Sequence, residues 1–477
     1  MDVDEARARV RERASAELVE RLEHLDATRG ERPRDDDAPG APDAGARADF
    51  DVGLVGGGLS MVYAPVLAAK GLRVAVFERG TAAVAHREWN ASLPELGRLV
   101  DAGVVTRGAL DGVILARYRE GLCRWHGGGT YPVTGVLDCA VDAGALLALA
   151  RSRAEALGVM FYDGHALVGH ATGADAVAMR FRVAGGGARE VTARVMVDAR
   201  GASSPSATAD LLCPTVGGVL EGIAEGGAPD EVDPSVGEIL VTTEGVDGGR
   251  QHIWEAFPAR PGETTVYLFY YDRAERVGAG SLVRLYARFF DALPRYKRGD
   301  VRLARPTFGY IPGWSRLTPA PRAPSPRVAL VGDAAARQSP LTYCGFGATL
   351  RSLSPGSERI ADAVEGRAHG SVVHDAGLHA GTGALAHMIA SPSTDPSRAG
   401  ELNALLDAAF STLHAMGDGA YGAMLRDEMP VRDFVKFLYE TSRRHPRVYR
   451  DVFRVLGAMG VSRWGMGIAR ALWERSP

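Results

Sequence analysis

A glycine-rich turn between two short apolar segments constrains this chain more than any other feature. Residues 49–55 are typical of a buried strand, and Gly56 and Gly58 stand in the turn that follows it. A helical run then leads to a second strand that ends at Glu78. Gly56 permits the sharp turn, and Gly58 lets the backbone approach a pyrophosphate at the helix N-terminus. The segment therefore predicts a β-α-β unit that binds a dinucleotide.

Two residues bear on this interpretation. Glu78 lies about 20 residues after the turn, where a carboxylate accepts hydrogen bonds from the adenosine ribose hydroxyls. Met61 stands where the fingerprint has its third glycine. Because that glycine serves helix–strand packing and not phosphate contact, we expect Met61 to be tolerated. A glycine-rich turn of another α/β protein is the alternative, but it does not explain Glu78.

A second turn of the same kind lies late in the chain. An apolar strand ends in Gly332-Asp333, and a Pro/Gly-rich segment then leads through Gly345-Phe346-Gly347 into a helix. The N-terminus of that helix would face the flavin edge where negative charge accumulates on reduction. Asp333 would bond a ribityl or pyrophosphate-side hydroxyl. Two such turns that serve one cofactor favour FAD over NAD, and an unrelated βα turn is the alternative.

Composition excludes several classes of protein and site. The net charge of −3 over 477 residues gives no indication of a nucleic-acid partner. The four cysteines are scattered without a CxxC pair, so neither a metal site nor a redox dithiol is indicated. The chain has no charge-free apolar run of about 18 residues and no apolar N-terminal segment. We therefore expect a cytoplasmic protein without a transmembrane helix.

The pattern of periodic segments and turns divides the chain into five parts. Residues 1–48 predict a charged helix and a flexible linker, and 49–213 the first part of an FAD-binding domain. Residues 214–325 predict a substrate domain of antiparallel strands. Residues 326–365 return to the FAD-binding domain, and 366–477 form a C-terminal helical region. The predicted fold class is α/β: a Rossmann-like FAD-binding domain with an inserted antiparallel-sheet domain and C-terminal helices.

Further candidate residues lie between the two turns. Arg87 follows the second strand closely enough to lie beside the FAD pyrophosphate or ribose, where a guanidinium can bind phosphate, although it could also belong to a surface turn. Residues 251–257 and 264–271 predict a hairpin. Three of its aromatic side chains would line the substrate pocket or belong to the core: Trp254, Tyr270 and Tyr271.

The tail of the chain is basic. Residues 443–477 contain eight arginines and two acidic residues, mixed with aromatic side chains. A basic amphipathic helix with aromatic residues can lie on an anionic membrane surface. The equal alternative is a helical cap docked on the rest of the protein.

The order of these turns resembles a family of FAD-dependent enzymes that includes aromatic hydroxylases, geranylgeranyl reductases, flavin halogenases and lycopene cyclases. The family pattern has a nucleotide fingerprint first, an Asp-Ala-x-Gly-x-x-Ser turn midway, here residues 198–204, and a Gly-Asp turn late. Within the family, three stretches look most like lycopene cyclases of the Cru type and their paralogues: Arg87–Asn90, Pro340–Gly347 and Leu402–Asp407.

The resemblance implies an apolar carotenoid or isoprenoid substrate, reduced FAD as the active form, and NAD(P)H at most as a transient reductant. In such cyclases a general acid is thought to protonate a terminal double bond of lycopene, and ring closure follows without net redox change. That chemistry requires a carboxyl group in an apolar environment, where burial raises its pKa and keeps it protonated.

The chain departs from the better-known cyclases in the middle domain. Their strand Phe-Leu-Glu-Glu-Thr corresponds here to residues 267–272, which lack the pair of glutamates. Asp272 at the end of this strand is our first candidate for the acid, and Glu255 on the hairpin partner is the second. A turn residue is the plain alternative for Asp272.

Other functions stay open. A redox flavoenzyme is one, either an isoprenoid reductase, a monooxygenase or a halogenase. Halogenation is disfavoured, because the chain has no Trp-x-Trp-x-Ile-Pro run and no lysine identifiable by position. A non-catalytic paralogue that binds FAD and a carotenoid is another, because the pair of glutamates is absent.

Overall fold

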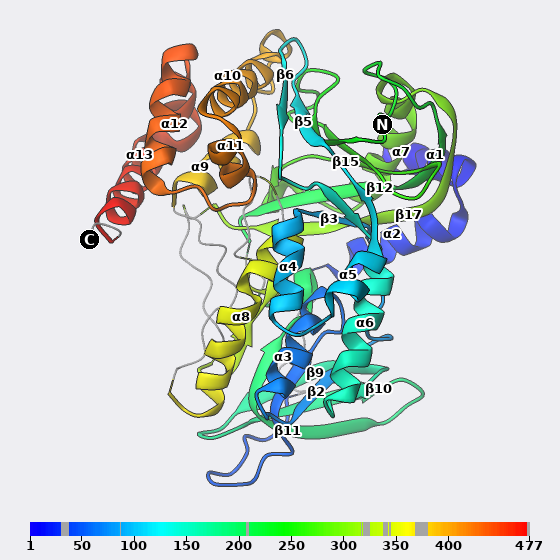
Figure 1. The fold of residues 1–477 in the computed structure, drawn as a ribbon, viewed down its shortest axis with the longest axis vertical. Helices are drawn as coiled ribbons and strands as arrows, with labels where there is room; N and C mark the ends of the chain where they lie inside the picture. Colours follow the sequence, from blue (N-terminus) through cyan, green and yellow to red (C-terminus); the bar gives the residue numbers. More distant parts are fainter. Residues whose placement is uncertain are drawn as a thin grey trace.

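The computed structural model describes residues 1–29, 38–85, 87–206, 209–315, 325–336, 345–367 and 380–474, together with Leu317 and Thr342. Within these residues the strands form sheets of seven, eight and three strands. Figure 1 shows the seven-stranded sheet in the lower half of the molecule and the eight-stranded sheet in the upper half. The predicted α/β class is confirmed, with a largely parallel sheet beside a largely antiparallel one.

The seven-stranded sheet carries the first glycine turn. Its strands are β1 (Phe50–Val55), β2 (Val74–Phe77), β8 (Met160–Tyr162), β9 (His165–Thr172), β10 (Val177–Val183), β11 (Ala188–Asp198) and β18 (Val328–Leu330). Strands β8, β2, β1, β11 and β18 run parallel, and β10 and β9 extend the sheet in antiparallel fashion. Because the carboxyl ends of parallel strands meet at one edge, the turns that follow β1, β11 and β18 lie together there.

Helices cover this sheet with a continuous apolar core. They are α3 (Tyr63–Ala69), α4 (Leu93–Asp101), α5 (Arg107–Val113), α6 (Ala143–Ala156) and α8 (Gly345–Val364). The helical run predicted between the first two strands is instead a 3₁₀ turn, η2 (Leu59–Val62), followed by α3. Pro65 has no N–H to donate to the Met61 carbonyl, so the α-helical ladder cannot extend back through that turn.

The eight-stranded sheet contains the predicted hairpin. Its strands are β5 (Glu120–Arg124), β6 (Thr130–Val133), β12 (Leu211–Ile223), β13 (Val236–Val241), β14 (Ile253–Pro258), β15 (Glu263–Phe269), β16 (Asp272–Arg273) and β17 (Gly299–Gly313). Strands β14 and β15 pair antiparallel, with Glu255 opposite Tyr267. Strands β5 and β6 belong to this sheet, although their residues lie in the segment that the sequence assigned to the first domain. The reason is that β5 pairs in parallel with β13, a long-range pairing that local patterns do not signal.

Different helices cover the two faces of the eight-stranded sheet. One face packs against α1 (Val3–Arg13), α2 (Ala16–Thr28) and α7 (Ser281–Tyr296). On the other face lie α9 (Ala380–Ile389), α10 (Glu401–Met416), α11 (Asp418–Leu425), α12 (Val431–Arg444) and α13 (Val448–Glu474). The predicted N-terminal helix is two helices, because the backbone leaves the helical conformation at Ala14 and Ser15 then caps the second helix by accepting a bond from Leu18 N.

A small antiparallel sheet joins the two large ones. It consists of β3 (Trp89–Ala91), β4 (Ile114–Arg117) and β7 (Cys139–Val141). Figure 1 shows β3 between the eight-stranded sheet and the helices α4 and α8. In the residues that the structure describes, no helix combines the length and apolar character needed to cross a bilayer.

Candidate functional site

The two glycine turns lie against each other at the carboxyl edge of the parallel sheet. Gly56 has a φ of +118°, and a Cβ there would lie 2.3 Å from the Ala199 carbonyl oxygen, so only glycine fits. Gly332 has a φ of +56°, and its Cβ would lie 2.7 Å from Ser60 Oγ. The first turn therefore touches both the segment after β11 and the segment after β18. Two turns far apart in sequence form one site, as predicted for a single dinucleotide.

Glu78 is tied to the first turn by backbone hydrogen bonds. Gly57 N donates to Glu78 Oε2 at 2.7 Å, and Gly80 N donates to Glu78 Oε1 at 3.0 Å. A carboxylate has about four lone-pair positions, so it can still accept hydroxyl donors. A Cβ at Gly58 would meet no atom within 4 Å, so the backbone there borders open space. Both observations fit an adenosine ribose and a pyrophosphate.

The midway turn contributes a buried ion pair that the sequence did not reveal. Arg200 Nη2 lies 2.8 Å from Asp198 Oδ2, and Ser204 Oγ donates to the same oxygen at 2.6 Å. Burial raises the pKa of Asp198, but the bonds from Arg200 and Ser204 outweigh it and leave the pKa below its usual value. The Gly201 backbone lies close to Asp333, since a Cβ there would be 3.9 Å from the Asp333 Cβ. Asp333 is thus placed at the junction of the midway turn and the late turn.

The start of α8 meets the stretch Arg87–Asn90. The Phe346 ring lies 4.8 Å from the Trp89 ring. A Cβ at Gly347 would lie 2.3 Å from Glu95 Oε1, and Glu95 in turn pairs with Arg351. Gly345 is the first residue of the helix. In the segment that leads into α8, residues 337–341, 343 and 344 lie outside the described residues.

Arg87 lies where the two large sheets come together. Its Nη2 donates to the Tyr310 carbonyl oxygen of β17 at 3.3 Å. A Cβ at Gly309 would lie 2.3 Å from the same nitrogen, so the guanidinium rests directly on the strand backbone. These contacts direct Arg87 toward the eight-stranded sheet, and its contact with a cofactor phosphate stays a prediction.

Glu255 faces the same junction from the eight-stranded sheet. Asn90 Nδ2 donates to Glu255 Oε1 at 2.9 Å. Burial raises the pKa of the Glu255 carboxyl to about 7, and the bond from Asn90 only partly opposes this effect. The side chain nevertheless keeps some accessible surface. Its cross-strand partner Tyr267 bonds the Glu88 backbone through its hydroxyl, which fixes β3 against the sheet.

Asp272 has a different environment. The side chain is fully buried, with Arg250 Nε at 3.1 Å and Arg276 Nε at 3.3 Å. Arg273 N also donates to its Oδ1 at 2.9 Å. Two guanidinium groups and a backbone N–H stabilise the charged carboxylate. These contacts are those of a structural ion pair.

The three predicted pocket aromatics lie on two different faces. Trp254 stacks on Tyr296 of α7, with ring centres 4.6 Å apart. Tyr270 lies beneath the Arg250 guanidinium at 4.6 Å and belongs to the same α7-side core. Tyr271 belongs to the opposite core, beside Phe269. Because side chains alternate along a strand, Glu255 points away from its neighbour Trp254 and toward the Tyr271 face.

Sequence reasoning missed two residues of the aromatic surface around Glu255, Phe257 and Tyr267. Phe257 and Tyr267 lie on its face of the sheet, together with Phe269 and Tyr271. Strict alternation from Glu255 would have identified Phe257, but Tyr267 requires the register between the two strands. The role of Asn90 could not be found from sequence, because its partner lies on a different sheet.

Comparison with known proteins identifies the architecture. No protein-family model matches the chain, and no curated protein sequence matches it. A geranylgeranyl bacteriochlorophyll reductase-like protein from Thermoplasma acidophilum matches 86% of this chain and 99% of its own, with a TM-score of 0.55 and 14% identity. A flavoprotein/dehydrogenase from Cytophaga hutchinsonii matches 87% and 100%, with a TM-score of 0.54 and 16% identity.

A halogenase is similar to the same extent. PltM, bound to phloroglucinol and FAD, matches 90% of this chain and 93% of its own, with a TM-score of 0.53 and 12% identity. The chain has the fold of these flavoproteins. At such identities the likeness shows the fold alone and leaves the chemistry to the residues of this chain.

Proposed function

We propose that this chain is an FAD-dependent enzyme in which Glu255 protonates a carbon–carbon double bond of an apolar, isoprenoid-type substrate. The observation that carries the proposal is the Glu255 carboxyl, which is held by Asn90 on an aromatic surface and whose pKa burial raises to about 7. A glutamate with its ordinary pKa would hold almost no proton at neutral pH. The raised pKa of Glu255 lets a substantial fraction of its carboxyl keep the proton at neutral pH.

The glycine turns support FAD as the cofactor. The residues that would hold its two halves are Gly56, Gly58, Glu78, Gly332, Asp333, Gly345, Phe346 and Gly347. Three observations fit such a molecule: the positive φ of Gly56, the open space at Gly58, and the contact between the first glycine turn and the late Gly332-Asp333 turn. FAD, when bound in its reduced form, supplies a hydride or electron density beside a cation. NAD(P)H would serve only as a transient electron donor.

Glu255 is better suited than Asp272 to the role of acid. Asn90 donates to Oε1 of Glu255, so the proton of the neutral carboxyl resides on Oε2, which can release it to a substrate carbon. Asp272 lies between two arginines, which stabilise the charged form that cannot donate a proton. To act as the acid, Asp272 would first have to be protonated, and its neutral carboxyl would no longer be the charged partner of Arg250 and Arg276. We therefore reverse the order of the two candidates.

The aromatic side chains around Glu255 would serve the cation that protonation creates. Phe257, Tyr267, Phe269 and Tyr271 share its side of the sheet. Their ring faces carry negative electrostatic potential and can stabilise a nearby positive charge. The same apolar surface would keep water away from the cation, because water would otherwise add to the cation.

Reduction of the double bond is the first candidate, because a reductase-like protein and a dehydrogenase share this architecture. A halogenase shares it too, but this chain lacks the Trp-x-Trp-x-Ile-Pro run. Ring closure without net redox change, as in lycopene cyclases, is the second candidate. The observation in its favour is that Arg87–Asn90, the stretch most similar to those cyclases, supplies the side chain that holds Glu255. Both reactions use the same acid and differ in whether reductant is consumed.

One experiment separates the two reactions. The purified protein is tested for bound FAD by its absorbance, reduced without oxygen, and offered lycopene or a geranylgeranyl lipid in liposomes. Loss of one double bond with stoichiometric oxidation of the flavin supports reduction, and a cyclised product with the flavin still reduced supports cyclisation. A hydroxylated or halogenated product that requires oxygen contradicts the proposal, as does FAD-loaded protein that transforms neither compound.

A further inference from the structure

Exposed apolar side chains gather on the last two helices. Among the described residues, ten large apolar side chains are exposed, and seven of them lie on α12 and α13. These seven are Val435, Tyr439, Tyr449, Phe453, Met459, Met466 and Trp473. Figure 1 shows the two helices next to each other at one corner of the molecule, in orange and red. Such a concentration marks an interaction surface.

Gly457, with a φ of +64°, breaks α13 into two helical segments, and the exposed apolar residues of the second segment form one stripe. Met459, Met466 and Trp473 follow one another at intervals of seven residues, which correspond to about two turns of an α-helix. Arg463 and Arg470 fall on the same side of the helix, between them, and are exposed as well. The exposed fractions reach 73% for Met459 and 83% for Trp473. The stripe therefore combines long apolar side chains with guanidinium groups.

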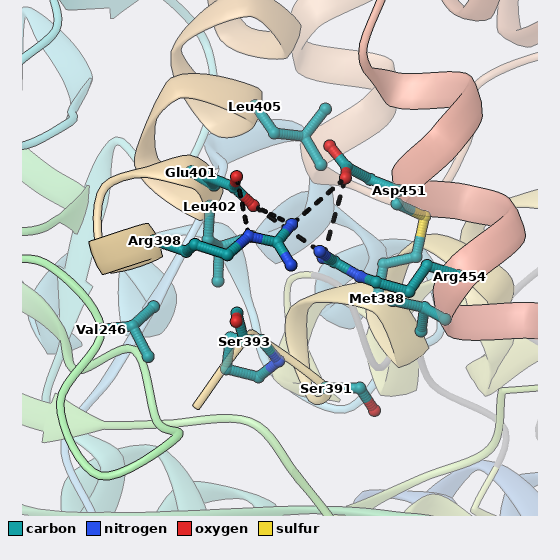
Figure 2. A pocket seen from close by; sticks show the side chains of 12 residues that line it. Val246, Met388, Ser391, Ser393, Arg398, Glu401, Leu402, Leu405, Asp451 and Arg454 are labelled. Carbon is teal, nitrogen blue, oxygen red and sulfur yellow. Dashed lines mark hydrogen bonds and ion pairs between the residues drawn. The ribbon is translucent and has the colours of Figure 1, made fainter. Parts of the chain in front are cut away.

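The opposite side of α13 is fixed to the rest of the protein. Trp464 and Ile468 pack against the core shared with the eight-stranded sheet. Near its start, Asp451 is buried and lies 3.9 Å from Arg398 and 3.7 Å from Arg454. Figure 2 shows these two arginines between Asp451 and Glu401 of α10. Arg398 also forms an ion pair with Glu401. The stripe is thus the outer surface of a helix that is anchored on its inner side.

Charge is divided unevenly along the chain. Residues 431–474 contain nine arginine and lysine residues and four acidic ones, a net charge of +5. The whole chain has a net charge of −3, which leaves −8 for the remainder. The surface of α12 and α13 is therefore attracted to anionic partners while the rest of the protein is repelled by them.

We propose that α12 and α13 dock this protein on an anionic lipid bilayer. Met459, Met466 and Trp473 enter the interface between headgroups and acyl chains, and the arginines beside them bind lipid phosphates. A second copy of this chain is a poorer occupant, because two faces of charge +5 would meet. The proposal does not rest on the reaction at Glu255, although the C-terminal helices also cover the sheet face that carries Tyr267 and Tyr271.

Vesicle flotation tests this docking. Full-length protein is mixed with phosphatidylcholine vesicles that contain or lack phosphatidylglycerol, and the bound fraction is measured at low and high salt. We expect binding to the anionic vesicles that weakens with salt. The triple variant Met459→Gln/Met466→Gln/Trp473→Gln should bind at least about tenfold more weakly. The double variant Arg463→Gln/Arg470→Gln should lose roughly tenfold on anionic vesicles alone.

Matched controls lie on the seven-stranded sheet. Met160 and Arg182 are exposed there, so Met160→Gln and Arg182→Gln should bind vesicles like the wild type. Circular dichroism and bound FAD, measured on every variant, verify that the fold is retained. Wild-type protein that does not float with anionic vesicles at low salt overturns the proposal. So does a dimer, detected by light scattering, that the triple variant converts to a monomer.

Discussion

The carboxyl edge of the parallel sheet and the Glu255 face of the antiparallel sheet build their sites from different material. At the sheet edge, glycines, backbone N–H groups and one carboxylate define the shape, and Gly56 fits because a Cβ would strike the Ala199 carbonyl. On the Glu255 face, side chains from two separate sheets define the shape of the site. Asn90 of the small sheet donates a hydrogen bond to Glu255 of the eight-stranded sheet. In our proposal the first kind of site binds a common cofactor, and the second decides the reaction.

The largest expected effect concerns this division of roles. Glu255→Gln should lower turnover at least about 100-fold, because an amide of nearly the same shape has no acidic proton. FAD should remain bound, because Glu255 lies on the other sheet. Turnover is measured on the substrate identified in liposomes, with Glu12→Gln on the exposed surface of α1 as the control. A fully active Glu255→Gln variant removes Glu255 from the chemistry.

Asp272→Asn should act on stability and leave the reaction largely unchanged. Removal of the charge leaves Arg250 and Arg276 beside a neutral amide, which should cost about 3 kcal/mol of unfolding free energy. Urea unfolding measures this loss, and turnover per folded molecule should stay within about twofold of the wild type. The reverse result, normal stability with lost turnover, would restore Asp272 as the acid.

Two alanine substitutions in the first turn should separate fold from cofactor binding. Gly56→Ala should lower stability by about 2–3 kcal/mol, because the new Cβ would lie 2.3 Å from a carbonyl oxygen at a positive φ. Gly58→Ala should change stability by less than about 0.5 kcal/mol, since its Cβ meets nothing, yet weaken FAD binding. Thermal unfolding and FAD titration measure the two effects. Equal stability of both variants would contradict this account of the turn.

The raised pKa of Glu255 should also appear in the pH dependence of stability. Its folded-state pKa of about 7 lies above the ordinary value of 4.5, so the folded state binds the extra proton between these limits. Stability should therefore fall as pH rises from about 5 to 8, by on the order of 2–3 kcal/mol. Glu255→Gln should lack this slope and be the more stable protein at pH about 8. Identical pH profiles for both proteins would show that burial does not raise this pKa.

The smallest expected effect belongs to Asn90. Its bond lowers the pKa of Glu255, so Asn90→Ala should move the alkaline limb of the rate profile to higher pH. A residue with a purely structural role would change the rate equally at all pH values. The pH dependence of turnover, with FAD binding as the control, distinguishes the two.

The sequence predicts the fold and the cofactor edge because their determinants are local. Strand runs, glycine turns and Glu78 are each legible within a few residues, and the structure brings them together because parallel strands end at one edge. The site on the second sheet depends on the register of Glu255 with Tyr267 and on the pairing of β5 with β13, which are long-range. The sequence therefore favoured Asp272, whose burial between two arginines only the fold reveals.

Infrared titration of Glu255 tests the central claim most directly. The C=O stretch of a protonated carboxyl is followed as a function of pH in the FAD-loaded protein, with Glu255→Gln as the reference that assigns the band. The account predicts a band that is lost in the variant and that titrates with an apparent pKa of about 7. A Glu255 carboxyl that titrates near the ordinary glutamate value would contradict the assignment of this residue as the acid.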